Sequence, residues 1–326
     1  MSFFLSFFYR HLFWSPPKPT TSFKGKTVIV TGANTGLGKE ATRWLVTLGA
    51  QVIMAVRNVN KGEAAARDIR SNTSCAPDAL KVWQLDMSSY ASVIAFAERA
   101  KTELPRLDAL LANAGLHTEE WRVTEGNEEH ITTNVVSTAL ISCLLYPKLQ
   151  QTAVQYKSDA HLSITSSDLY YAADFKERLA PEGQLFATLN DEKKSNMADR
   201  YNVSKLLEIY IIREIAAATP YDSHRVIVNC VPPGFCHSEL TRERETFGIK
   251  LLKTVLARPT EVGARTLVHA ISAAPASHGQ YIEDGVKIRQ TLRHTQGEEG
   301  ADIQRRFWVE LKQILESIRP GVTSFK

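Results

Sequence analysis

The feature that most constrains the fold of this chain is a regular alternation between short apolar runs, rich in β-branched residues, and longer amphipathic stretches. Such an alternation is typical of βαβ units, in which helices join parallel strands and cover both faces of the sheet. The apolar runs lie at residues 26–31, 51–56, 81–85, 107–111, 161–165, 226–230 and 280–282. The sequence therefore predicts an α/β fold of the doubly wound Rossmann type, with about seven parallel strands.

Two long stretches interrupt this alternation, and each follows the carboxyl end of a predicted strand. They are residues 168–200 and 235–258. Ligands bind at this edge of an open α/β sheet, so we expect both stretches to form substrate-covering loops. We expect a single domain over residues 22–326 that ends in an amphipathic helix, preceded by an aromatic arm and linker at 1–21.

Charge and cysteine content limit the classes of partner. The chain carries 39 basic and 35 acidic side chains, a net charge of +4, without a long block of either sign, which argues against a nucleic-acid partner. The 4 cysteines form no C-x-x-C pair and have no histidines at ligand spacing beside them, so no metal site is predicted. We expect a reduced, cytoplasmic protein; association into a homo-oligomer is left open.

The first fourteen residues are strongly aromatic but are interrupted by Arg10 and His11. A membrane-spanning helix needs roughly 20 apolar residues, and in a signal peptide the basic residues precede the apolar run. Two alternatives remain. Either the segment folds onto its own domain or a protein partner, which its short length and few basic residues favour, or it makes weak contact with a membrane surface through Phe4, Phe8 and Leu12.

A glycine-rich turn follows the first predicted strand and opens a helical stretch. Glycines there allow a tight turn and a close approach of the backbone to a pyrophosphate, and a helix N-terminus favours the phosphate charge. This context favours a dinucleotide site over a merely structural turn. The residues predicted to contact the cofactor here are Thr31, Gly32, Asn34, Thr35, Gly36, Leu37 and Gly38.

Tyr201 and Lys205 stand four residues apart in a helical stretch, so both side chains project from one face of the helix. A phenol with a pKa near 10 is a poor base at neutral pH, and a nearby ammonium stabilises its phenolate. The pair therefore fits a proton-transfer site. Taken alone, however, a Tyr-x-x-x-Lys pair is commoner on the surface of an ordinary helix.

The order of motifs along the chain resembles the short-chain dehydrogenase/reductase family. The glycine spacing, three residues and then one, is that of the family, and the resemblance covers roughly residues 22–285. Within the family the chain is most similar to retinol-dehydrogenase-like and fungal secondary-metabolite members. The residues that carry the resemblance after the glycines are Asp86, Asn113-Ala114-Gly115, Asn134, Ser166-Ser167, Tyr201 with Lys205, and Pro233-Gly234.

This resemblance implies four catalytic side chains. Tyr201 gives or takes the hydroxyl proton, Lys205 tunes it and binds the nicotinamide ribose, and Ser167 rather than Ser166 meets the substrate oxygen. Asn134 is implied to hold a water beside the lysine; a buried asparagine satisfied by backbone is the alternative. The further cofactor contacts implied are Asp86 at the adenine, Asn113, Ala114 and Gly115 at the floor, and Pro233, Gly234 and Ser238 at the nicotinamide.

The choice between cofactors depends on the residues after the second predicted strand. An acidic residue about 20 positions past the glycines would bind a free ribose 2′-hydroxyl, but Val56-Arg57-Asn58 stands there. Arg57, with Lys61 a turn later, suits a 2′-phosphate, although a plain surface arginine explains Arg57 equally well. The sequence predicts NADP(H) as the preferred cofactor, with NAD(H) as the second choice.

Together these features predict an oxidoreductase that transfers hydride between NADP(H) and a carbonyl or alcohol of a lipophilic or polyketide-like small molecule. Three departures from the family put the shape of the substrate site in question: Ala112 in place of a frequent asparagine, a second proline at Pro232, and an unusually long interval from Ser167 to Tyr201. The alternative is a catalytically silent nucleotide-sensing regulator or scaffold. Such a protein would ordinarily have lost one of the four catalytic side chains.

Overall fold

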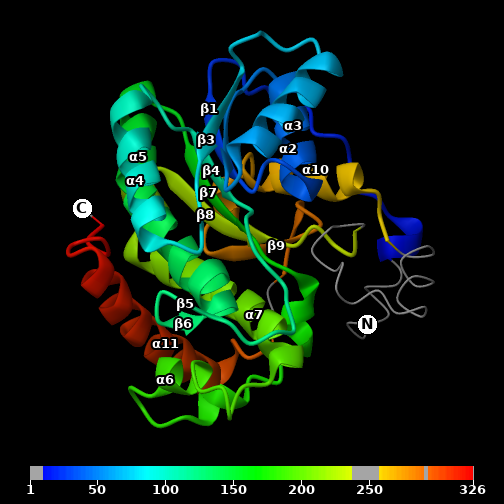
Figure 1. Ribbon diagram of the computed structural model, residues 1–326. Coiled ribbons are helices and arrows are strands. Elements are labelled where there is room, and N and C mark those ends of the chain that lie inside the picture. Colours follow the sequence, from blue (N-terminus) through cyan, green and yellow to red (C-terminus); the bar gives the residue numbers. More distant parts are fainter. Residues whose placement is uncertain (1–9, 237–256, 290–292, 326) are drawn as a thin grey trace.

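The computed structural model describes residues 10–236, 257–289 and 293–325. Its main sheet is 8-stranded, in the order β10-β9-β8-β7-β4-β1-β2-β3 (Figure 1). All strands but β10 run parallel to their neighbours. The parallel strands are β1 (Thr27–Thr31), β2 (Gln51–Val56), β3 (Leu80–Gln84), β4 (Ala109–Ala112), β7 (Ala160–Thr165), β8 (Val226–Val231) and β9 (Gln280–Glu283).

This sheet confirms the predicted α/β architecture, with one addition. The two-residue strand β10 (Lys287–Ile288) turns back and pairs antiparallel with β9, at the edge of the sheet. The chain leaves β1 toward β2 and β3 on one side and continues with β4 and β7 on the other. The order of the strands therefore reverses between β1 and β4, and their carboxyl ends open the crevice in which such sheets bind ligands.

Helices cover both faces because successive strand residues point in opposite directions. Val28 and Val30 of β1 pack into one buried cluster, and Ile29 between them packs into the other. The first face is covered by α2 (Gly36–Thr47), α3 (Val59–Ser71) and α10 (Thr260–Ala270). The second is covered by α4 (Tyr90–Glu103), α5 (Thr138–Tyr156) and α7 (Met197–Ala218).

The connection between β4 and β7 contains more than one helix. A small hairpin of β5 (Val123–Thr124) and β6 (Asn127–Glu128) precedes the π-helix η1 (Ile131–Ser137), which runs directly into α5. Short π-helical segments often occur at functional sites. Every residue of η1 is buried.

The long interval after β7 is packed rather than extended. It forms the short helices η2 (Asp168–Ala172), η3 (Lys176–Leu179) and α6 (Leu185–Leu189) before α7 begins. The Glu310 carboxylate of α11 (Gly297–Ile318) accepts the backbone N–H groups of Leu185 and Phe186 at 3.1 and 2.9 Å. The Phe186 ring stacks on Phe307, with centroids 5.7 Å apart. The C-terminal helix therefore supports the extension at the lower end of the molecule (Figure 1).

Short elements complete the described fold. They are α8 (Tyr221–His224), which precedes β8, and η5 (Pro275–Ser277), which precedes β9. Of the second predicted loop, 235–258, the structure describes the two ends, where Cys236 and Arg258 form an isolated parallel bridge. No helix in the described ranges is both long and apolar enough to cross a bilayer.

Candidate active site

The turn between β1 and α2 has the geometry that the glycines predict. Gly32 and Gly36 adopt φ values of +66° and +55°, which glycine tolerates best. A Cβ on Gly38 would lie 2.4 Å from the Gly32 carbonyl oxygen, so α2 packs against the turn with no space for a side chain. Thr35, the residue before α2, makes no side-chain cap to the first turn. The backbone N–H groups there suit an anion.

Thr31 joins the glycine turn to the end of β4. Its hydroxyl oxygen accepts the backbone N–H groups of Asn113 and Ala114 at 2.9 and 2.8 Å, and the Asn113 amide donates to the Thr31 carbonyl at 3.0 Å. The next residue, Gly115, lies beside the predicted catalytic residues, because a Cβ there would be 3.2 Å from Asn134 Oδ1 and 3.5 Å from Lys205 Nζ. The predicted floor residues thus connect the glycine turn to the lysine.

Asp86 lies after β3, at the same edge of the sheet. Its Oδ1 accepts the backbone N–H and the hydroxyl of Ser88 at 3.0 and 2.7 Å, and its own N–H donates to Ser92. These bonds fix the start of α4. The contact of Asp86 with an adenine ring stays a prediction.

Helix α7 carries the predicted proton-transfer pair, which the structure buries. Tyr201 is 6% exposed and Lys205 4%. The lysine Nζ lies 5.6 Å from the centre of the tyrosine ring and donates to the Thr165 carbonyl at the end of β7 at 3.0 Å. Burial raises the pKa of Tyr201, while the charge of Lys205 and hydrogen bonding to Ser167 act in the opposite direction.

The two serines after β7 point to different partners. Ser166 donates to the Lys205 carbonyl at 3.0 Å and is buried, so its hydroxyl is used to hold α7 against the strand. Ser167 is half-buried, accepts the Leu169 N–H at 3.2 Å and shares a hydrogen bond with Tyr201. Ser167 is thus the serine whose side chain lies beside Tyr201, and its contact with a substrate oxygen stays a prediction.

Asn134 lies in the middle of η1 and is fully buried. Its Oδ1 accepts the Leu116 N–H at 2.9 Å, and its Nδ2 donates to the Leu116 carbonyl at 3.1 Å and to Ser204 Oγ at 3.0 Å. Both polar atoms of the Asn134 side chain are therefore hydrogen-bonded to protein groups, as expected for a structural buried asparagine. Its place beside Gly115 still brings it next to Lys205.

Two residues at the site, His117 and Glu208, were not predicted from the sequence. The His117 ring stacks on the Tyr201 ring, with centroids 4.3 Å apart and planes at 15°. Glu208 Oε1 accepts a bond from Lys205 Nζ at 2.7 Å. Glu208 could have been found, because it is an acidic residue in the otherwise apolar helical run LLEIYII. His117 follows Gly115 by two residues and has no comparable signal.

At the other end of the crevice, Arg57 and Lys61 are solvent-exposed. Arg57 follows β2 directly, and Asn58 caps α3 by accepting the Lys61 N–H at 3.0 Å. A Cβ on Gly62 would lie 2.6 Å from a Val82 methyl, so the start of α3 packs closely on the sheet. The backbone that carries both cations is thus fixed, while their side chains form no ion pair with any residue in the described ranges.

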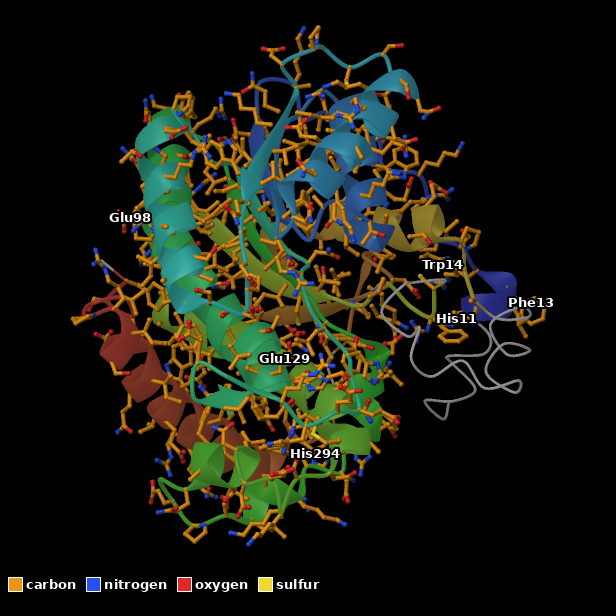
Figure 2. All side chains as sticks on the ribbon, viewed as in Figure 1. His11, Phe13, Trp14, Glu98, Glu129 and His294 are labelled. Atoms are coloured by element: carbon orange, nitrogen blue, oxygen red, sulfur yellow. The ribbon has the colours of Figure 1, made fainter. Side chains whose placement is uncertain are left out.

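The segment after β8 meets the N-terminal arm. Gly234 has a φ of +74°, and a Cβ there would lie 2.9 Å from Arg258 Nη1 and 3.0 Å from His11 Nε2. The His11 Nε2 accepts the Phe235 N–H at 2.8 Å. Figure 2 shows His11 and Trp14 at this side of the molecule. Pro233 precedes the glycine, and Ser238 lies outside the described residues.

Arg10 attaches the arm to the sheet edge. Its guanidinium donates to Asp284 at 3.1 Å and lies 3.2 Å from Glu283 and 3.6 Å from Asp168, all largely buried. Arg258 Nη2 donates to the Arg10 carbonyl at 2.9 Å. The described part of the arm therefore packs on its own domain. Phe4 and Phe8 of the alternative membrane-facing surface lie outside the described residues, and Leu12 is 50% exposed.

Three features at the carboxyl edge of the sheet suit a dinucleotide. Gly38 has no space for a side chain, the first turn of α2 offers N–H groups to a pyrophosphate, and the buried Lys205 ammonium lies at the same edge of the sheet. A phenol and a hydroxyl next to that ammonium can hold and transfer a proton at a substrate oxygen. This combination suits proton transfer at the oxygen of an alcohol or a carbonyl group.

Comparison with known proteins leads to the same chemistry. A family model described as short chain dehydrogenase matches residues 26–159. The short chain dehydrogenase/reductase dmxR8 of Cryptosporiopsis sp. (strain 8999) is 47% identical over 98% of this chain and 99% of that protein. The short-chain dehydrogenase anuD of Penicillium roqueforti is 38% identical over 98% of this chain and 84% of that protein.

The fold agrees as well. A crystal structure of an uncharacterised protein from Mycobacterium paratuberculosis matches 91% of this chain and 95% of that one with a TM-score of 0.66, at 24% sequence identity. At that identity the likeness concerns the fold. The relatives aligned over nearly the whole chain decide the identity: this protein belongs to the short-chain dehydrogenase/reductase family, oxidoreductases that act on alcohol and carbonyl groups.

Proposed function

We propose that this protein is an NADP(H)-dependent reductase/dehydrogenase that interconverts a carbonyl and an alcohol on a lipophilic or polyketide-like small molecule. The observation that carries the proposal is the convergence of Ser167 and Tyr201, with the Lys205 ammonium beside the phenol. All four predicted catalytic side chains are present, which favours turnover over the regulator or scaffold reading.

In the proposed reaction, Ser167, Tyr201 and Lys205 act in turn on the substrate oxygen and its proton. The nicotinamide, when bound, supplies or accepts the hydride. In the direction of reduction, the Ser167 hydroxyl donates a hydrogen bond to the substrate oxygen as negative charge develops on it, and Tyr201 transfers its proton to that oxygen. Lys205 then stabilises the phenolate that remains.

The electrostatics of the site suit Tyr201 as an acid. Burial is the largest influence on its pKa and raises it, more than Lys205 and Ser167 lower it. A phenol whose pKa lies above its ordinary value carries its proton at neutral pH. We therefore propose Tyr201 as the proton donor when a carbonyl is reduced.

The proposed preference for NADP(H) rests on charge at the adenosine end. Arg57 follows β2 directly and Lys61 lies in the first turn of α3; neither β2 nor that first turn carries an acidic residue that could bind a 2′-hydroxyl. A 2′-phosphate between them gains charge-assisted hydrogen bonds that a hydroxyl does not. NAD(H) is the weaker second cofactor in this proposal.

The proposed substrate class rests on the kinship with fungal relatives. The segment Asn196-Met197-Ala198-Asp199-Arg200-Tyr201, which resembles retinol-dehydrogenase-like members, forms the start of α7 at the site. The stacked His117 ring adds a flat surface beside Tyr201. We treat residues 22–326 as one catalytic domain and residues 1–21 as its arm.

A screen of carbonyl compounds that follows NADPH absorbance tests the proposal, with Tyr201→Phe as the matched control. We expect some lipophilic ketones or aldehydes to be reduced by the unmutated protein and at least about 100-fold more slowly by the variant. Binding of NADPH to the unmutated protein without turnover of any compound would instead support the regulator or scaffold.

A further inference from the structure

Glu208 lies almost one helical turn beyond Lys205 on α7 and forms a buried ion pair with it. The Lys205 Nζ and Glu208 Oε1 atoms are 2.7 Å apart, and the two side chains are 4% and 1% exposed. An ion pair removed from water interacts strongly, because little solvent screens it. The lysine implied to tune Tyr201 therefore has a second, opposite charge beside it.

The negative charge of the buried Glu208 carboxylate is balanced by the Lys205 ammonium. Its second oxygen, Oε2, is buried and has no hydrogen-bond partner among the described residues. Burial raises the pKa of Glu208 to about 7, against the opposing effect of Lys205. At neutral pH this group is therefore close to the midpoint of its titration.

The groups around Glu208 leave Lys205 as its direct ionic partner. From β8, the Cys230 thiol faces the carboxylate, and both burial and that charge raise its pKa. The helix η1, which packs against α7, has the sequence ITTNVVS and so presents no ionisable side chain to Glu208. From η2 and β9, Asp168 and Tyr281 bond to each other at 2.8 Å.

Helix α11 meets α7 farther along. There Gln304 donates to Glu214 at 2.5 Å. Glu214 is therefore a carboxylate of the same helix that is engaged away from the lysine. It provides a matched control for Glu208.

We propose that Glu208 is a positioning residue for proton transfer, which holds the Lys205 ammonium in place and offsets part of the positive charge that this ammonium presents to Tyr201. An ammonium has three N–H donors. One is bonded to the Thr165 carbonyl and one to Glu208, which leaves the third for a ribose hydroxyl. The inference rests on the proposed role of Tyr201 as the proton donor.

The charge state of Glu208 then sets the acidity of Tyr201. With Glu208 ionised, the pair is close to neutral and phenolate is weakly stabilised. With Glu208 protonated or replaced by glutamine, the full ammonium charge acts on the phenol and lowers its pKa. Since the Glu208 charge already raises the pKa of Tyr201, we expect its removal to lower that pKa by about one unit, the lower end of the range for a neighbouring charge.

The test measures Tyr201 directly. In protein labelled with 13C at tyrosine Cζ, the Tyr201 signal is assigned from its loss in Tyr201→Phe, and its titration is followed in the unmutated protein, Glu208→Gln and Glu214→Gln. Glu208→Gln should lower the midpoint by about one pH unit, and Glu214→Gln should leave it unchanged. In the unmutated protein, a small step near pH 7 should mark the ionisation of Glu208 and should be absent from Glu208→Gln.

An unchanged Tyr201 midpoint in folded Glu208→Gln, or equal shifts in both variants, would overturn the inference. If Glu208→Gln does not fold, absence of the step near pH 7 from the unmutated protein overturns it. These signals do not require turnover. A shifted midpoint in a protein that reduces no carbonyl would therefore reject the proposed function while supporting the Glu208 inference.

A second readout connects the inference to catalysis. With an identified substrate, the pH profile of kcat in Glu208→Gln should shift in the same direction as the Tyr201 midpoint. In Glu208→Asp, which keeps the carboxylate, the profile should return most of the way to its position in the unmutated protein. A purely structural role would lower kcat at all pH values without moving the profile, which would contradict the inference.

Discussion

The two ends of the proposed cofactor site hold their charged side chains in opposite ways. Near the predicted nicotinamide position, Tyr201 and Lys205 are buried and bonded to neighbouring elements. At the adenosine end, Arg57 and Lys61 are exposed and form no ion pair with a described residue. Buried charges act through a low dielectric and can govern chemistry, whereas exposed charges are screened by salt. The buried end should therefore set the rate, and the exposed end should set the choice of cofactor.

Tyr201→Phe should have the largest effect. Removal of the hydroxyl takes away the proposed proton donor and leaves the ring stacked on His117. We expect turnover to fall at least about 100-fold, the usual scale of general acid–base catalysis, with NADPH affinity nearly unchanged. Stopped-flow turnover and fluorescence titration of NADPH separate the two quantities. Near-unmutated turnover would remove Tyr201 from the mechanism.

Lys205→Ala should lower both turnover and NADPH affinity. We expect turnover to fall by about 100-fold and NADPH binding to weaken by about 10-fold, because one ammonium is proposed to serve both the phenolate and the ribose. The variant also leaves Glu208 without its cation, so its thermal midpoint should fall. The double variant Lys205→Ala with Glu208→Gln should recover stability but not turnover. Loss of turnover with unchanged NADPH affinity would contradict the ribose contact.

Arg57→Ala tests the exposed end. It should remove most of the NADPH preference, about 10-fold to 100-fold in kcat/KM, with little change in activity supported by NADH. Arg67→Ala is the matched control, because Arg67 is an exposed arginine on α3, the helix that begins just after Arg57. Equal losses in the two variants would indicate a general effect of surface charge instead of a phosphate contact.

Deletion of residues 1–14 should have the smallest effect on the chemistry. It removes Arg10 from Asp168, Glu283 and Asp284, so the thermal midpoint should fall, by no more than about 2–4 °C per kcal/mol of stability lost. Vesicle sedimentation should be unchanged, because the described arm packs on the domain. Detergent-sensitive sedimentation of the full chain that is lost in the truncated protein would show that the arm binds membranes.

Local patterns predicted the sheet and much of the buried end. The strand runs are recognisable because strands covered on both faces are continuously apolar. The spacing of Tyr201 and Lys205 places them on one helix face, but only the order of motifs along the chain distinguishes the pair from one on an ordinary helix. The structure brings Ser167 and Tyr201 together as expected, across a long interval that the sequence marked as unusual.

The parts that sequence did not predict depend on contacts between distant segments. Arg10 meets Asp284 across 274 positions, and no local pattern encodes that pairing. Strand β10 has two residues, too few for a periodic signal. Glu208 is the exception, since its place in an apolar helical run one turn after Lys205 could have identified it. Its effect on Tyr201 still requires the burial that only the packed structure shows.

The most direct test of the contrast between the two ends is the ratio of kcat/KM for NADPH and NADH in the unmutated enzyme at low ionic strength. Two cations at the 2′ position predict a preference of about 10-fold to 100-fold for NADPH, equivalent to roughly 1.4–2.8 kcal/mol. The preference should shrink as salt is added, because both cations are exposed. Equal efficiency with the two cofactors would contradict the account of the adenosine end.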